Sequence, residues 1–579
     1  MNNKKNTTKY KFGSGFYVAN IMEIFERLAW YGFFAVSSIY MTTPLSQGGV
    51  GFTDIQRGAI QGIIPFFLYL LPVLTGALGD KLGYRRMFII SFSIMTPCYF
   101  LLGHVKSFGW FFIVLSGIAL GAACFKPIVV GTIAHSTNDK NRGLGFGIFY
   151  TMVNIGGFLG PLIAGSMRAI SWDAVFMMSA FWIAINFIPV LIFYRDPPSL
   201  QTTSTHLKSV ITQAQTVLGN ARFALLVFVS IALFMAAGVG WLSYLHSVFC
   251  ILTWLGINVL WHFVGNENSE SWWRQKVRIS NARFAIYLLI LSLFWSVYNQ
   301  LFYTLPLFIR DFADTRDLVN FIAMFGQGAI EFFAYVDKAA IGQALHELSI
   351  TLASGGAVDF EALRLEWVHL KVNVPLEDLK LLVADMAVLS DPVNGLQSIH
   401  IAQFTEQLLA YRQINPEYLI NLDFAAIVIL QILVSYLCQK FNPMYVLACG
   451  LVITASAFIL LASSNHIVSG ILVTTVILLI ALGEMFTSPK SQEYVAFIAP
   501  KEQTAVYMGY YFVSMALGFL FAGFLSGWSY SELALKEGKP ELMWGVFSLI
   551  ALVACISLLI FQSHVTKHQT EIEGSTNYS

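Results

Sequence analysis

Long apolar runs separated by short polar loops dominate this chain. A helix that crosses a membrane needs roughly 20 apolar residues. Runs of about that length occupy residues 16–41, 57–77, 87–104, 109–132, 145–167 and 174–194 early in the chain, and residues 284–309, 418–438, 443–463, 468–488, 503–527 and 542–562 later. The pattern predicts an all-α polytopic membrane protein with two bundles of six helices.

A further apolar stretch, residues 222–264, separates the two sets and is about twice the length of one span. Gly238 and Gly240 lie near its middle, where a turn can form. We therefore predict a helical hairpin between the bundles, which gives about fourteen transmembrane helices in total.

The polar segments set the expected domain boundaries. We expect an N-terminal six-helix bundle at 1–194, a linker with the hairpin at 195–283, a seventh bundle helix at 284–310, a soluble insertion at 311–417, the rest of the C-terminal bundle at 418–565 and a tail at 566–579. The insertion carries fifteen acidic and six basic residues. Apolar residues at helical spacing predict that it is mostly helical; they are Ile341, Leu345, Leu348, Leu352, Leu363, Trp367 and Leu370.

Lysine and arginine residues gather in alternate loops of the predicted spans. Cytoplasmic loops of membrane proteins are enriched in these residues. Threading the spans alternately puts the N-terminal lysines, the basic loop at 81–86, the linker and the segment 274–283 on one side. We expect both termini in the cytoplasm and the insertion outside it.

Composition narrows the function classes. Hydrophobic residues make up 56% of the 579 residues, charged residues 12%, and the mean hydropathy is +0.66. The formal net charge of +1 argues against a nucleic-acid binder. The six cysteines stand singly, and His346-Glu347 lacks the second histidine of a zinc-protease helix because position 350 is Ile350. We expect no enzyme, no metal and no cofactor.

Ionisable residues inside apolar spans are costly and are functional candidates by default. The first span contains Glu23, Glu26 and Arg27, and the fourth contains Lys126 before Pro127. Glu484 lies in the second bundle. Protonation of an acid one helical turn from Arg27 would release the arginine, so Glu23, Glu26, Arg27, Lys126 and Glu484 are candidates for proton coupling. The plain alternative is an ion pair that locks helices together.

The same charges suit a zwitterionic substrate. Arg27 and Lys126 place cations in one bundle, and Glu484 places an anion in the other. Asp423 is a less certain candidate because it lies near the start of its span, where it could be interfacial.

The loop Gly76-x-x-x-Asp80-x-x-Gly83-x-Arg85-Arg86 follows the second span. Its glycines permit a tight turn and close helix approach, and Asp80 can cap the helix ends of the next bundle and pair with arginine. The loop resembles the signature motif of the major facilitator superfamily.

A narrower resemblance rests on two motifs, Glu23-x-x-Glu26-Arg27 and Phe149-Tyr150-x-x-Val153-Asn154-x-Gly156. They resemble motifs of the proton-dependent oligopeptide transporter (POT) family. Further matches are Lys126-Pro127, Phe294-Trp295-x-x-x-x-Gln300 and Gly483-Glu484-x-x-x-Ser488-Pro489. The segment 311–417 has no match in this resemblance.

The resemblance implies a monomeric, multi-pass symporter of a bacterial inner membrane that imports di- and tripeptides with protons by alternating access. Its substrate, protons and the lipid bilayer would be its only partners. The implied substrate-binding residues are Arg27, Tyr31, Tyr69, Lys126, Asn154, Asn299, Glu484 and Tyr511.

Two departures keep alternatives open. Asn299 stands where the family usually carries a carboxylate, and Tyr511 where it often carries a tryptophan. The family's eighth-helix asparagine could correspond to Asn415, Asn421 or Asp423. The protein could instead move another organic solute, such as a siderophore or a drug-like compound, including by export. It could also be a transporter-like sensor that uses residues 311–417.

Overall fold

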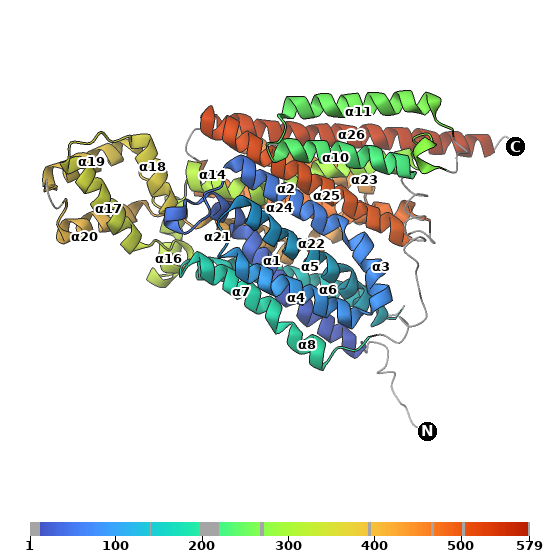
Figure 1. Ribbon diagram of the computed structural model, residues 1–579, viewed down its shortest axis with the longest axis horizontal. Helices are drawn as coiled ribbons and strands as arrows, with labels where there is room; N and C mark the ends of the chain where they lie inside the picture. Colours follow the sequence, from blue (N-terminus) through green and yellow to red (C-terminus); the bar gives the residue numbers. More distant parts are fainter. Residues whose placement is uncertain are drawn as a thin grey trace, which may run out of the picture.

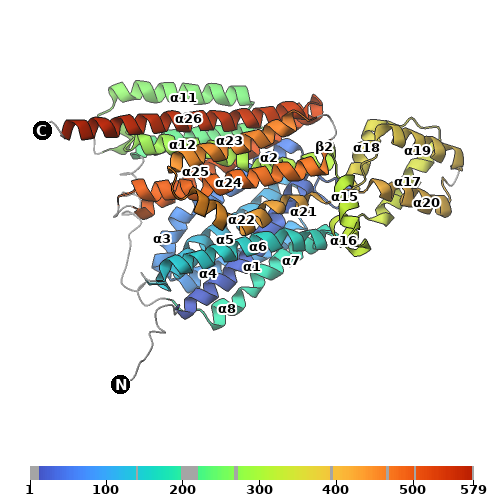
Figure 2. The same ribbon diagram turned by 180° about the vertical axis from the view of Figure 1, so that it is seen from behind.

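The computed structural model describes residues 12–138, 141–196, 219–266, 271–391, 395–464, 468–500 and 504–576. It is an elongated helical body with a smaller helical lobe at one end, and both chain termini lie at the opposite end (Figures 1 and 2). The N-terminal lysines and residues 197–218 of the predicted linker lie outside the described residues.

The N-terminal bundle contains eight helical segments. They are α1 (Ser14–Thr42), α2 (Asp54–Leu70), α3 (Pro72–Leu82), α4 (Tyr84–Leu102), α5 (Phe108–His135), α6 (Arg142–Arg168), α7 (Trp172–Ile185) and α8 (Phe187–Ile192). The predicted span 57–77 is two helices, because the chain breaks at Leu71 before Pro72. Thr53 and Gln56 form a capping box that starts α2.

The predicted hairpin consists of α10 (Ala221–Gly238) and α11 (Tyr244–Val264), with the turn next to Gly240. Gly240 has a φ of 87°, which a side chain would disfavour. The hairpin lies along one side of the body, and α11 is its outermost helix in both views (Figures 1 and 2).

The C-terminal bundle begins with a broken helix. The predicted span 284–309 is divided into α12 (Ala282–Tyr298), α13 (Gln300–Tyr303) and α14 (Leu305–Phe312), with breaks at Asn299 and Thr304. The remaining segments are α21 (Pro416–Ile420), α22 (Leu422–Cys438), α23 (Pro443–Ala462), α24 (Gly470–Ile498), α25 (Thr504–Ser529), a π-helical turn (Tyr530–Lys536) and α26 (Pro540–Thr576).

Two of these helices are longer than their apolar runs. The sequence predicts spans that end near 488 and 562, but α24 continues to Ile498 and α26 to Thr576. The expected tail at 566–579 is therefore helical through residue 576. Both extensions contain polar residues, so the helices continue beyond the apolar runs.

Twelve helices in the described part of the chain are long and apolar enough to cross a membrane. They include both hairpin helices, but neither α1 nor the pair α2 and α3. Helix α1 carries three ionisable residues in its first half, and α2 alone has 17 residues. The total of fourteen spans stays a prediction.

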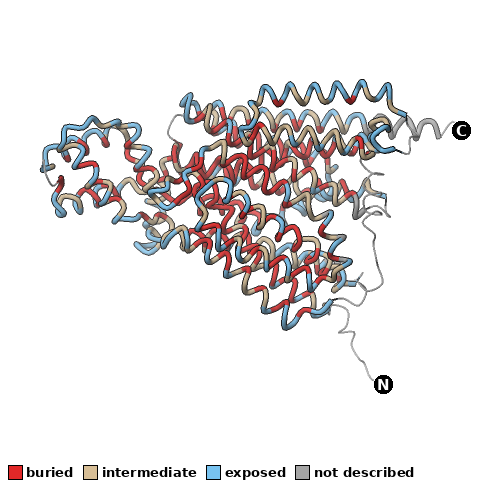
Figure 3. Tube along the Cα trace, in the orientation of Figure 1, coloured by how far each residue is buried: buried red, intermediate tan, exposed pale blue. Residues whose placement is uncertain are grey.

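The lobe contains α15 (Arg316–Ala323), α16 (Gln327–Phe333), α17 (Lys338–Ala353), α18 (Phe360–His369), α19 (Leu376–Leu389) and α20 (Ser398–Leu408). Its helical character matches the prediction, since Ile341, Leu345, Leu348, Leu363 and Trp367 form its buried core. Figure 3 shows buried residues on the inner faces of these helices and, separately, through the middle of the body.

The lobe is fastened to the C-terminal bundle. Strand β1 (Ala313–Asp314) pairs in parallel with β2 (Val468–Ser469). The Asp317 carboxylate accepts hydrogen bonds from the backbone N–H groups of Gly470 and Ile471, at 3.1 and 2.9 Å, at the start of α24. A carboxylate at a helix N-terminus is stabilising, so the lobe is anchored to α24.

The two bundles approach most closely where α2 crosses α25. A Cβ atom at Gly58 would overlap the backbone of Gly523, and one at Gly62 would lie 2.9 Å from the carbonyl oxygen of Leu520. Glycine at these positions lets the two backbones touch.

Candidate functional site

A charged cluster lies inside α1. The Arg27 Nε atom lies 3.1 Å from Glu23 Oε1, and the same guanidinium forms an ion pair with Glu26. All three side chains are buried. Two acids therefore share one arginine, which leaves a negative charge in a poorly solvated position unless one acid is protonated.

Gly156 makes room for this cluster. A Cβ atom at position 156 on α6 would overlap the Cβ atom of Arg27. Four residues further along α6, a Cβ at Gly160 would lie 2.9 Å from the backbone nitrogen of Gly32. The glycines of α6 thus allow α1 to pack tightly and fix the position of Arg27.

Lys126 faces an aromatic ring instead of an acid. Its ammonium lies 4.3 Å from the ring centroid of Tyr69 on α2, a cation–π contact. Within the described residues, no carboxylate lies within ion-pair distance of Lys126. The Lys126 ammonium is therefore not paired with Glu23 or Glu26 in this arrangement and is available to another anion.

The opposite bundle supplies a pair of acids. The Tyr298 hydroxyl donates a hydrogen bond to Asp423 Oδ2 at 3.2 Å, and Tyr298 also lies close to Glu484. Asp423 Oδ1 and Glu484 Oε2 have no hydrogen-bond partner among the described residues.

Asp423 is 0% exposed, so protein encloses its side chain although the residue lies near the start of its span. The reason is α21, which starts the span at Pro416 and places Asp423 one short helix deeper. Two carboxylates without a cation in a buried site cannot both stay ionised at little cost, so the pair holds a proton readily.

Aromatic side chains line the space between the bundles. Tyr31 packs edge-on against Phe424, with ring centroids 4.9 Å apart, and the Arg27 guanidinium lies 5.6 Å from the Tyr31 ring. Tyr150 on α6 interacts electrostatically with Glu484 of the other bundle, yet it is 50% exposed. The Asn154 amide donates to the carbonyl oxygen of Tyr150 at 2.8 Å.

Two predicted binding residues are occupied by internal partners. Asn299 is buried at the break after α12, and its amide donates to the Trp295 carbonyl oxygen at 2.6 Å. Tyr511 on α25 is buried and shares a hydrogen bond of 3.0 Å with the Ser491 hydroxyl. Their role in substrate binding stays a prediction.

Asp196 lies at the loop between α3 and α4, and the expected role of Asp80 stays a prediction. Gly83 has a φ of 89°, and the backbone N–H of Arg85 donates to Asp196 Oδ1 at 2.7 Å. Asp80 lies in α3, but its side chain is outside the described ones. Asp196 from the end of the bundle therefore caps α4.

The other motif residues have clear surroundings. The Arg85 side chain donates to the carbonyl oxygen of Leu191 at 2.8 Å, and Arg86 is exposed. A Cβ at Gly76 would lie 3.3 Å from Pro127 on α5, so this glycine allows α3 to pack beside Lys126.

Polar contacts join the two bundles at the end that carries the lobe. The Ser38 hydroxyl donates to the carbonyl oxygens of Phe302 and Tyr303 at 3.1 Å. Arg168 Nη1 lies 2.8 Å from Glu417 Oε2. Further contacts of this kind run from Arg57 to Tyr303, from Tyr303 to Gln61 and from Arg310 to Thr42. The bundles are thus closed against each other at the lobe end.

Sequence reasoning missed Asp423, Tyr298 and Tyr150 as a group. Asp423 and Tyr298 lie on helices more than a hundred residues apart, and only the packing of α12 against its neighbours brings them to Glu484. The available clue was the acid near the start of a span.

Comparisons with known proteins agree with this arrangement. The family model of the Major Facilitator Superfamily matches residues 21–336 and 413–576, which leaves out most of the lobe. The peptide transporter YePEPT of Yersinia enterocolitica is 31% identical over 159 residues, which cover 26% of this chain and 31% of that protein. A di-/tripeptide transporter of Lactococcus lactis subsp. lactis is 29% identical over 188 residues, which cover 31% of this chain and 38% of that protein.

The alignments therefore span about a third of the length of these relatives. Solved structures align over a much greater length. A POT family transporter in complex with a thioalcohol-conjugated peptide covers 96% of each chain, with a TM-score of 0.61 and 16% identity. A POT family transporter in complex with 5-aminolevulinic acid gives a TM-score of 0.60 at 16% identity, covering 96% of each chain. At that identity the likeness shows the fold.

The two sets of matches confirm the predicted resemblance to POT family proteins. Since the family model covers most of the sequence, the chain belongs to the Major Facilitator Superfamily.

Proposed function

We propose that this protein is a proton-coupled symporter that imports di- and tripeptides, or peptide-like compounds, by alternating access. The observation that carries the proposal is the placement of opposite charges in the two bundles. Lys126 and Arg27 lie on one side, and Glu484 with Asp423 on the other. A peptide zwitterion presents one carboxylate and one ammonium, which this arrangement complements.

The Lys126 ammonium would receive the peptide carboxylate. It has no described acidic partner, and it is held in place by the Tyr69 ring. Arg27 is already bound to two acids, so it would turn toward the substrate only as one of them is protonated. The peptide ammonium would meet Glu484, whose Oε2 atom lacks a hydrogen-bond donor.

Protons would be taken up at both charged sites. In the first bundle, protonation of Glu23 or Glu26 would remove one of the two ion pairs that hold Arg27. In the second, Asp423 and Glu484 lie close to Tyr298 and supply an acid that Asn299 lacks. An amide cannot bind a proton at neutral pH, so Asp423 would replace the carboxylate expected at position 299.

In alternating access, the two ends of the paired bundles would open and close in turn. In this structure the lobe end is held by the contacts of Ser38 and Arg168 with the C-terminal bundle. Opening of the lobe end requires these contacts to break. A peptide that bridges Lys126 and Glu484 would draw the two bundles together around these two residues. The close glycine contact of α2 with α25 supplies a place about which the bundles could rock.

The direct test is uptake of a labelled dipeptide such as alanyl-alanine into liposomes under an inward proton gradient. We expect accumulation that Glu484→Gln abolishes. Glu493→Gln is the matched control, because Glu493 lies on the same helix, is largely exposed and pairs with Lys490. Accumulation that is equal with and without the gradient would contradict proton coupling.

A second candidate is transport of another organic solute. The buried, internally bonded states of Asn299 and Tyr511 favour it, because both differ from the family pattern and neither faces open space. A competition screen separates the two candidates. Failure of every dipeptide to displace a bound substrate would favour the second.

A further inference from the structure

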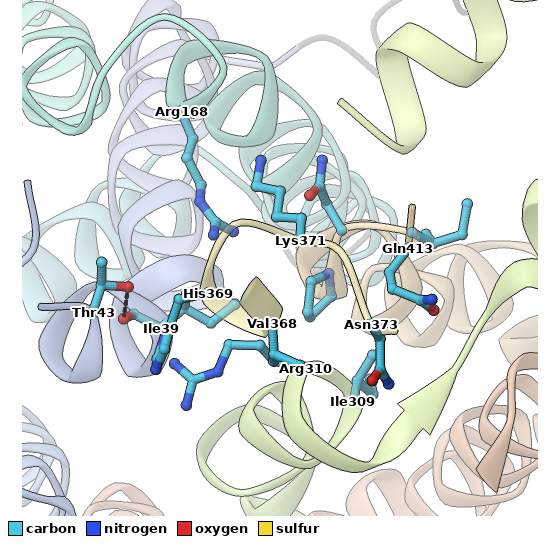
Figure 4. A pocket seen from close by; sticks show the side chains of 13 residues that line it. Ile39, Thr43, Arg168, Ile309, Arg310, Val368, His369, Lys371, Asn373 and Gln413 are labelled. Carbon is cyan, nitrogen blue, oxygen red and sulfur yellow. Dashed lines mark hydrogen bonds between the residues drawn. The ribbon is translucent and has the colours of Figure 1, made fainter. Parts of the chain in front are cut away.

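A small pocket lies between the lobe and the closed end of the two bundles (Figure 4). The N-terminal bundle contributes Arg168 from the end of α6, and the C-terminal bundle contributes Arg310 from α14. The lobe contributes His369 and Lys371, and Asn415 lies just before α21. Three cationic side chains therefore surround one pocket that lies apart from the central site.

Two of the three cations are neutralised. Arg168 is paired with Glu417, and Arg310 donates from Nε and Nη2 to both oxygens of Asp311, at 2.6 and 2.9 Å. Glu417 and Asp311 therefore each form an ion pair with one of these arginines. The pocket keeps one positive charge that these pairs do not balance.

That charge belongs to Lys371. Its ammonium lies 5.2 Å from the ring centroid of Tyr335, and no carboxylate in the described part of the chain lies within ion-pair distance of it. Figure 4 shows Lys371 and Arg168 reaching the same edge of the pocket from different elements, and the two charges repel each other. An anion placed between them would remove that repulsion.

Polar atoms around the pocket also lack partners. Asn415 is 2% exposed, and its Oδ1 atom has no hydrogen-bond partner among the described residues. The Nδ1 atom of His369 is likewise buried without one. Since the oxygen and nitrogen of an asparagine amide are exchangeable by a flip, Asn415 can present an N–H donor to a ligand. Buried polar groups without a protein partner are uncommon, so these two atoms can bond to a ligand in the pocket.

The backbone holds Lys371 in an unusual position. Its φ is 66°, the only positive value at a non-glycine residue in the described chain. The Lys371 carbonyl oxygen accepts from the backbone N–H of Gln413 at 3.2 Å, which ties this turn to the segment before α21. A lysine that is kept at a position suited to glycine places its ammonium in the pocket.

We propose that this pocket binds a single carboxylate group, with Lys371 as its main ligand and Arg168 and Asn415 as additional donors. A carboxylate is planar, small and able to accept several hydrogen bonds. Its source is either a small free acid or the C-terminus of a peptide. The bound group would contact the lobe and both bundles at once.

Thermal unfolding of the purified full-length protein in detergent tests the proposal, with acetate as the probe and acetamide as its neutral analogue. We expect a saturable rise in the unfolding midpoint with acetate and none with acetamide. The rise should be lost in Lys371→Met. It should persist in Lys338→Met, which removes an exposed lysine of the same lobe that pairs with Glu406.

Binding at the central site is a separate outcome. A response that survives Lys371→Met but is lost in Lys126→Gln would overturn the proposal, as would an equal, unsaturable response in all variants. Alanyl-alanine and its C-terminal amide then identify the source in the Lys126→Gln background. If alanyl-alanine raises the unfolding midpoint, its amide does not, and the rise needs Lys371, the pocket binds the C-terminus of peptides. If acetate raises the midpoint and alanyl-alanine does not, the pocket binds small free acids.

Discussion

The hydroxyl of Tyr298 donates a hydrogen bond to Asp423 Oδ2 at 3.2 Å, and Glu484 lies close to both residues. The three side chains come from α12, α22 and α24. A buried pair of acids beside one hydroxyl is a favourable place for a proton to bind and leave. We propose that this pair is the proton site of the C-terminal bundle, in place of the amide at position 299.

Asp423→Asn should uncouple transport from the proton gradient. The amide keeps the shape of the side chain and cannot be ionised. We expect gradient-driven dipeptide accumulation to fall by roughly tenfold or more, which corresponds to about 1.4 kcal/mol, while exchange of labelled for unlabelled dipeptide persists. Loss of both activities together would instead indicate a structural role. Asn421→Ala, two residues away at the helix break, serves as the comparison.

Lys126→Gln should weaken binding of peptides with a free carboxylate. Loss of one hydrogen bond to a charged group costs about 2 kcal/mol, or roughly 30-fold in affinity. A dipeptide amide lacks that charge and should bind both forms equally. The measurement is a titration of each ligand against the purified variants. An equal loss for dipeptide and amide would contradict the assigned role of Lys126.

Gly156→Ala should disturb the α1 charge cluster. The added methyl group would overlap the Cβ atom of Arg27, and overpacking of this kind costs about 1–3 kcal/mol. We expect reduced dipeptide uptake and a lower unfolding midpoint. Gly147→Ala is the matched control on α6, because a Cβ there meets nothing within 4 Å and alanine favours the helix. Equal uptake by both variants would contradict the packing argument.

Arg168→Gln should loosen the closed end beside the lobe. It leaves Glu417 buried without its cation, and breaking a buried ion pair by removal of one partner costs about 3–5 kcal/mol. We expect a lower unfolding midpoint in detergent. The double variant Arg168→Gln with Glu417→Gln should recover most of the loss, since neither charge is then unpaired. No recovery would mean that Arg168 acts through other contacts, such as its stacking on Trp172.

Lys371 should make stability depend on pH. Burial, and then the repulsion from Arg168, lower the pKa of Lys371 to about 7, against the attraction of Glu417 and Asp337. Its ordinary pKa is 10.5. The unfolded chain therefore binds more protons than the folded one between about pH 7 and pH 10.5, and stability rises with pH across that window.

Lys371→Met removes this dependence, so it should stabilise the protein more at pH 6 than at pH 9. His369 faces the same pocket, but burial, together with the charge of Arg310, lowers its pKa to about 4, so it stays neutral over this range. Thermal unfolding at the two pH values gives the comparison. Equal stabilisation at both would contradict the low pKa of Lys371.

The first charged cluster could be predicted because it is local. Glu23, Arg27 and Tyr31 recur at helical spacing on one helix, and the structure places them together. The acid pair of Asp423 and Glu484 could not be predicted in the same way, because it depends on how α22 and α24 pack and on the extra turn α21 before the break at Asn421.

In the lobe, too, local features could be predicted from the sequence and contacts between distant segments could not. Its helices follow from the apolar spacing of Ile341, Leu345 and Leu348, which is a local property. Its attachment through β1 and Asp317, and the pocket around Lys371, depend on segments that are far apart in the sequence. A positive φ at a lysine also has no sequence pattern that would reveal it.

The central claim is that a peptide and a proton move together. It is tested most directly by proteoliposomes that contain a pH-sensitive dye and receive external alanyl-alanine without any imposed gradient. The account predicts internal acidification that follows dipeptide uptake and is absent in Asp423→Asn and Glu484→Gln. Dipeptide uptake without acidification would contradict it.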